Sequence, residues 1–107
     1  MNITELTTVI RSKNAGPFEL TFDFIFKTEE IFRKVVESKV INEKLIAELY
    51  QIPVENVISV IPYPPAKAIK ATIIRPRSAG DLGETDVYGA QQHGPLLTIE
   101  IPWEGSV

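Results

Sequence analysis

Residues 18–27 alternate between apolar and polar side chains, and this alternation constrains the fold more than any other feature of the sequence. Phenylalanine or leucine occupies every even position from 18 to 26, whereas the odd positions are polar or charged except for Ile25. A strict period of two over this length is typical of a half-buried strand in an antiparallel sheet. We therefore expect a central strand with its even-numbered residues in the core.

Two short helices are predicted after this strand. Thr28 and Asn42 each precede a segment that begins with glutamate, as expected for residues that cap a helix N-terminus, where acids are also favoured by the macrodipole. The sequence Ile52-Pro53 ends the second helix. The apolar stripes of the two helices are Ile31, Phe32, Val35 and Val36, and Leu45, Ile46, Leu49 and Tyr50.

Three further strands complete the predicted sheet. Residues 57–61 are rich in β-branched side chains, and residues 67–74 follow them after a proline-rich turn as a hairpin partner. Residues 96–101 are predicted to form the last strand, with Leu97, Ile99 and Ile101 facing inward. Residues 4–10 are expected to form a short helix or an extended lead-in.

This order of elements predicts an α+β fold. The expected architecture is a ferredoxin-like split βαβ, in which a four-stranded, mainly antiparallel sheet carries helices on one face and a long loop precedes the last strand. A length of 107 residues is typical of a single domain, here residues 1–107.

Composition narrows the classes of function. The net charge of −3 argues against a nucleic-acid partner, and the absence of cysteine excludes disulfides and thiol chemistry. No apolar run approaches the roughly 20 residues of a membrane span, and no secretory leader is visible. We expect a cytoplasmic protein without a membrane partner. A lone histidine cannot assemble a metal site by itself, so neither a metal nor a cofactor is expected.

Residues 75–97 form the segment richest in candidate functional side chains. Loops longer than about 12–15 residues are uncommon in compact domains and are usually functional or disordered. His93 is first of all suited to pin the loop through a hydrogen bond, and it is also a candidate for contact with a ligand or for catalysis as a general acid or base. Gln91 and Gln92 can hydrogen bond to a carboxylate or to backbone, and Tyr88, two residues after Asp86, can bind a ligand or anchor the loop.

A second polar segment precedes the turn at Gly16-Pro17. Arg11, Ser12, Lys13 and Asn14 supply two cations and several hydrogen-bonding groups, which suit a small anion-binding nest in a loop. The segment has neither Walker nor G-x-G-x-x-G spacing. Because the long loop can cross a small domain, we expect the two segments to meet and form one polar surface.

A basic stretch lies between these segments. Residues 56–80 contain four cations and no acid, namely Lys67, Lys70, Arg75 and Arg77. Such a stretch can attract an acidic substrate or partner, or it can protect an edge strand against unwanted pairing.

Two motifs carry a resemblance to a known family. Residues 11–26 read RSKNAGPFELTFDFIF and residues 85–97 read TDVYGAQQHGPLL. At these motifs, and along essentially its whole length, the chain resembles the bacterial domain-of-unknown-function family 4387. Members of that family are similar to the C-terminal ferredoxin-like domain of the AtuA proteins of acyclic terpene utilisation. Residues 13–16 depart from the acidic turn of that domain.

The resemblance implies a function in a two-component assembly, because the small protein is typically encoded beside a large AtuA-type protein. It implies a small, non-catalytic or site-completing subunit that associates with this large protein in carboxylic-acid or acyl-thioester catabolism. The alternative is a stand-alone homo-oligomeric module that binds a small carboxylate. Either interpretation predicts an oligomer. A complete enzyme is the weakest interpretation, since one histidine and scattered carboxylates form no catalytic spacing.

Overall fold

The structure, a computed structural model, describes residues 1–74 and 94–104. Four strands form one sheet in the order β1-β2-β4-β3, and every neighbouring pair is antiparallel. The strands are β1 (Thr7–Gly16), β2 (Glu19–Phe26), β3 (Val57–Tyr63) and β4 (Ala68–Ile74). Because β2 pairs with a strand on each side, the central strand predicted from the alternation at residues 18–27 is confirmed.

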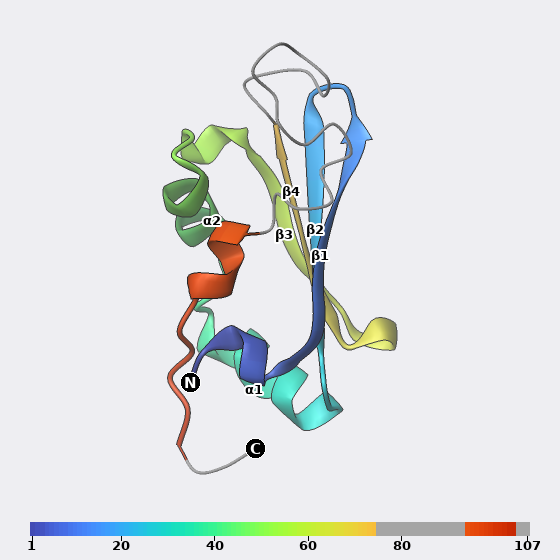
Figure 1. The fold of residues 1–107 in the computed structure, drawn as a ribbon, viewed down its shortest axis with the longest axis vertical. Helices are drawn as coiled ribbons and strands as arrows, with labels where there is room; N and C mark the ends of the chain where they lie inside the picture. Colours follow the sequence, from blue (N-terminus) through green and yellow to red (C-terminus); the bar gives the residue numbers. More distant parts are fainter. Residues whose placement is uncertain (75–93, 105–107) are drawn as a thin grey trace.

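Two helices, α1 (Glu29–Ser38) and α2 (Glu43–Tyr50), lie on one side of the sheet, as Figure 1 shows. They connect β2 to β3, and β4 lies between these two strands, which therefore run parallel to each other. This is a split β-α-β unit, and the α+β architecture is compatible with the predicted ferredoxin-like fold. The short 3-10 helices η1 (Ile3–Glu5) and η4 (Gly94–Thr98) lie on the same side as α1 and α2 (Figure 1).

The strand at the edge beside β2 is β1, and here the sequence prediction was wrong. Residues 11–17 were predicted to form a loop, but the chain is extended from Thr7 to Gly16, after only one turn of 3-10 helix. The core-side positions of this strand after Ile10 are Ser12 and Asn14. Because these side chains are polar, β1 lacks the apolar alternation that identifies a strand.

The strand predicted at residues 96–101 is also absent, since η4 covers the first half of this segment and Glu100 forms only an isolated bridge with Asn2. Leu96 and Ile99 are buried, whereas Leu97 is 40% exposed. Buried positions three residues apart match the 3.0-residue repeat of a 3-10 helix rather than the two-residue repeat of a strand. Of the three side chains expected to face inward, Ile99 and Ile101 are buried and Leu97 is not.

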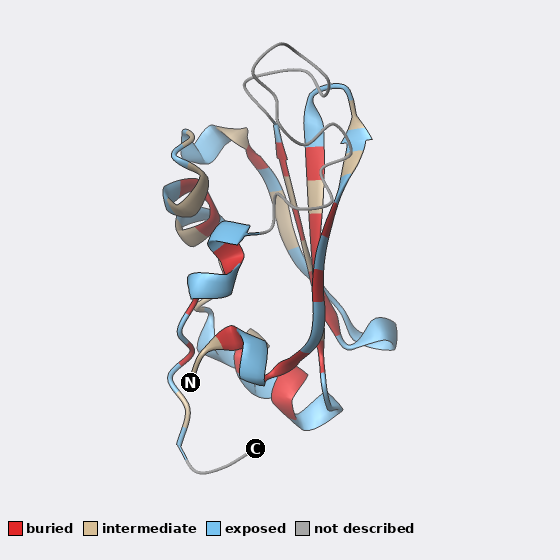
Figure 2. Ribbon diagram, in the orientation of Figure 1, coloured by how far each residue is buried: buried red, intermediate tan, exposed pale blue. Residues whose placement is uncertain are grey.

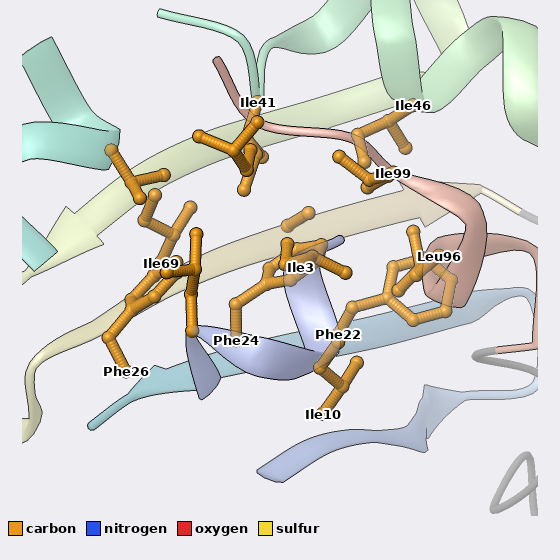
Figure 3. Close-up of a cluster of buried hydrophobic side chains, with 14 of the residues drawn as sticks. Ile3, Ile10, Phe22, Phe24, Phe26, Ile41, Ile46, Ile69, Leu96 and Ile99 are labelled. Atoms are coloured by element: carbon orange, nitrogen blue, oxygen red, sulfur yellow. The ribbon is translucent and has the colours of Figure 1, made fainter. Parts of the chain in front are cut away.

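The core lies between the sheet and the helical layer. Phe22, Phe24 and Phe26 project from β2 toward the helices and the C-terminal segment (Figure 3), and all three are fully buried. Buried residues also recur along the other strands (Figure 2). Phe18 is the exception to the predicted alternation: it is 53% exposed because it lies in the β1–β2 turn, before β2 begins.

The predicted helix caps are confirmed. The Thr28 hydroxyl accepts a hydrogen bond of 3.1 Å from the Ile31 amide, and the Asn42 side-chain oxygen accepts one of 2.9 Å from the Leu45 amide. Each contact satisfies an amide that has no partner within its helix, and this fixes where the helix begins.

The two ends of the described chain are tied together. The Ile101 amide donates to the Met1 carbonyl, and the Ile3 amide donates to the Ile99 carbonyl, each over 2.9 Å. Trp103 packs against the core, and the Lys34 ammonium lies 5.1 Å from the centre of its ring. This tryptophan therefore docks on its own domain.

Candidate functional site

The face of the sheet opposite the helices, called the open face below, is not covered by any helix of residues 1–74 or 94–104 (Figure 1). Strand register aligns its side chains in three rows that cross all four strands. Each row is given in the order β1, β2, β4 and β3. The apolar row is Val9, Ile25, Ala68 and Tyr63, and the charged row is Arg11, Asp23, Lys70 and Ile61. The hydroxyl row is Lys13, Thr21, Thr72 and Ser59.

Asp23 is the centre of the charged row. Its residue is only 6% exposed, although it lies on the open face. The Arg11 Nε donates to Oδ2 over 3.3 Å, and the Lys70 ammonium lies 3.4 Å from Oδ1 as an ion pair without hydrogen-bond geometry. Because both cations come from neighbouring strands, the carboxylate is held from two sides and is compensated for its burial.

The apolar row contacts this ion pair, and the hydroxyl row has an internal contact of its own. The Lys70 ammonium also lies 5.5 Å from the centre of the Tyr63 ring, a cation–π distance. In the hydroxyl row, Thr21 and Thr72 share a hydrogen bond of 3.3 Å between their hydroxyl groups. The polar side chains of the open face are thus linked across three strands.

Exposed apolar side chains flank these polar groups. Val9 is 41% exposed, Tyr63 is 46% exposed and Ile61 is 51% exposed. Apolar side chains gathered on one surface of a small protein are typical of an interaction site.

A hollow of about 270 Å³ lies beside the charged row. It is lined by Arg11, Ser12, Lys13 and Asp23, and it therefore presents two cations and one carboxylate. This composition suits a small anion.

A larger groove of about 380 Å³ lies on the other side of the molecule, between β3 and the α1–α2 connection. Its lining is largely apolar and includes Val36, Ile41, Val60 and Pro62, with one cation, Lys39, and one acid, Glu43.

The structure places four of the nine residues predicted for the site. Arg11, Ser12, Lys13 and Asn14 all belong to β1, so they form part of an extended strand and not the loop in which an anion-binding nest was expected. Arg11 and Lys13 occupy the open face, whereas Ser12 is buried and Asn14 is half-buried on the core side.

The other five predicted residues lie outside the described residues. They are Asp86, Tyr88, Gln91, Gln92 and His93, and the expected meeting of residues 75–97 with Arg11, Lys13 and Asn14 stays a prediction. Arg75 and Arg77 of the basic stretch lie outside the described residues as well.

Asp23 and Lys70 are central to the open face, and the sequence reasoning did not single out either as a site residue. The available signal was an acid in the middle of an otherwise phenylalanine-rich strand. An acid at such a position is nearly always paired when it is buried. Its partners come from residues 12 positions before it and 47 positions after it, so only the strand register identifies them.

Within residues 1–74 and 94–104, no three or more histidine, cysteine, aspartate or glutamate side chains gather as a metal site would require. In the part of the chain that the structure describes, no helix is long and apolar enough to cross a membrane.

The family of the chain follows from comparison with known proteins. The model of the family described as domain of unknown function DUF4387 matches residues 3–100. No curated protein and no solved structure gave a significant match. The matched residues contain the whole sheet, both α-helices and η4. The chain belongs to the DUF4387 family.

Proposed function

We propose that this chain is a small subunit that associates with a large AtuA-type protein in carboxylic-acid or acyl-thioester catabolism. It acts as a binding component that completes or supports a site on the larger chain, and it works in the cytoplasm. The resemblance to the AtuA ferredoxin-like domain supports this choice of partner.

The observation that carries the proposal is the open face. The sheet buries phenylalanines on its helix side, yet it exposes Val9, Ile61 and Tyr63 on the opposite side, where none of the described helices packs. A two-layer domain needs no exposed apolar residues on its second sheet face, and a binding subunit does. The ion pairs around Asp23 add fixed polar groups, as is usual in protein interfaces.

Co-expression with the neighbouring large AtuA-type protein tests the proposal. The two chains should elute together in size-exclusion chromatography, with a mass by light scattering that equals a defined complex. The complex should also turn over carboxylic-acid or acyl-thioester substrates faster than the large protein alone. Separate elution of the two chains at micromolar concentration would contradict the proposal.

The hollow beside Arg11 favours a second candidate, a homo-oligomeric module that binds a small carboxylate. Two cations, Arg11 and Lys13, line it against the single carboxylate of Asp23. This alternative predicts that the isolated chain is an oligomer by light scattering and binds acetate or succinate in calorimetric titrations. A monomer that binds neither anion excludes it.

A further inference from the structure

We infer that the open face is the surface that docks the larger chain, and that the docked segment presents carboxylates to the charged and hydroxyl rows and apolar side chains to the apolar row. The inference rests on the proposed function and specifies where and by which chemistry the partner binds.

The edges of the sheet are less suited to binding a partner. Strand addition needs a regular edge, and cationic residues, prolines and bulges oppose it. On β1, Arg11 and Lys13 are cationic and the register is irregular at both ends. On β3, Pro62 has no amide proton and the register is irregular between Val57 and Ser59. Docking on the open face needs no regular strand edge, so these features do not oppose it.

The charge of the open face selects an acidic partner. Its side chains include three cations, Arg11, Lys13 and Lys70, and two acids, Asp23 and Glu19, so the excess is +1 (three minus two) on a chain whose net charge is −3. Carboxylates on the partner would complement this excess, and complementary potentials give specificity and faster association.

The same excess argues against a second copy of this chain as the occupant. Two open faces packed against each other would bring their cations together, and like charges across an interface oppose association. The partner on this face therefore differs from the chain itself.

The polar groups of the open face are ordered before binding. Asp23 holds Arg11 and Lys70, and Lys70 lies over the ring of Tyr63. Side chains that are already fixed lose little freedom when a partner binds, which favours affinity. The partner needs only to supply the missing acids and apolar groups.

Two double variants test the inference without disturbing the ion pairs of Asp23. The open-face variant combines Lys13→Glu with Ile61→Ser, which lie on opposite sides of the open face. Lys44→Glu with Val54→Ser makes the same chemical changes at exposed positions outside it, on α2 and on η2 (Val54–Asn56). Binding of each full-length variant to the large AtuA-type protein is measured by interferometry, and melting temperatures confirm that both variants fold.

The open-face variant should bind about tenfold or more weakly than the wild type, whereas the control variant should bind within about twofold of it. If the wild type binds and the open-face variant binds equally well, this inference is overturned and the proposed function stands. If the wild type forms no complex, both are overturned.

Two other outcomes also overturn the assigned occupant. Binding to phosphatidylserine vesicles that the open-face variant alone loses would identify an anionic lipid surface. Self-association of the wild type that the open-face variant alone loses would identify a second copy.

Discussion

At the scale of single residues, Asp23 is the side chain on which the open face depends. Asp23→Asn keeps its shape and removes its charge, so Arg11 and Lys70 lose their shared partner. Because the acid is buried and the cations are partly exposed, we expect a loss of about 1–2 kcal/mol in the free energy of unfolding. Urea denaturation measures it.

The matched control for Asp23→Asn is Glu30→Gln, which removes an exposed partner of Lys34 within one helix. Such pairs contribute about 0.5 kcal/mol or less. Equal losses for the two variants would mean that Asp23 acts as an ordinary surface charge.

A second prediction at the scale of single residues concerns Tyr50 and the dependence of stability on pH. The Tyr50 ring stacks on Phe22 at 4.8 Å, and burial raises the pKa of its phenol well above the ordinary value near 10. The folded state therefore binds this proton more tightly than the unfolded chain does. This contribution to stability is fully present below pH 10 and is lost as the pH rises above 10 toward the folded-state pKa.

Tyr50→Phe removes this proton, so its stability should fall less between pH 9 and pH 11 than that of the wild type, by about 1 kcal/mol at pH 11. Urea denaturation across this range measures the difference. Tyr63→Phe, at a position that is 46% exposed, is the control and should follow the wild type. Parallel curves for Tyr50→Phe and the wild type would contradict the prediction.

At the scale of elements, Phe22 on β2 and Phe18 in the turn before β2 form a matched pair of phenylalanines. Phe22 is fully buried, whereas Phe18 is 53% exposed in the preceding turn. Phe22→Ala should cost about 3–5 kcal/mol because it leaves a cavity in the core. Phe18→Ala should cost less than about 1 kcal/mol. Thermal unfolding of both variants measures the contrast, and similar costs would show that the alternation does not report burial.

The elements that were predictable from sequence are those with a local signal. The alternation of residues 18–27 identified β2, and the capping residues Thr28 and Asn42 identified the start of each helix. β1 was not recognised because Ser12 and Asn14 stand where apolar residues would reveal a strand. Its strand conformation comes from pairing with β2, which is a tertiary effect that composition does not report.

The candidate site was less predictable than the fold for a related reason. The residues of the charged row are far apart in sequence, and only strand register brings Arg11, Asp23 and Lys70 together. A one-residue change of register would send these side chains to the opposite face of the sheet. Composition drew attention to Arg11 and to the basic stretch that contains Lys70, but it did not show that Arg11 and Lys70 share a surface.

At the scale of the whole molecule, the C-terminal segment closes the core over the sheet. Leu96 is fully buried on η4, whereas its neighbour Leu97 is 40% exposed. Leu96→Ala should therefore cost about 2–5 kcal/mol, and Leu97→Ala should cost less than about 1 kcal/mol. Chemical denaturation of the two variants measures these losses of stability. The strand first expected here would bury Leu97 and expose Leu96, so it would make Leu97→Ala the more destabilising substitution.

The position of β1 has a consequence for synthesis on the ribosome. Within residues 1–74 and 94–104, the four strands of the sheet end by Ile74, and the edge that a ferredoxin-like plan would give to its last strand is filled by the first one. At roughly 5–20 residues per second, Leu96 is made about one to four seconds after Ile74. Hairpins form within microseconds, so once these residues have left the ribosome the nascent sheet can pair completely while its phenylalanine face still lacks Leu96, Ile99 and Ile101. Residues that are translated after the sheet thus shield a surface that is assembled before they emerge.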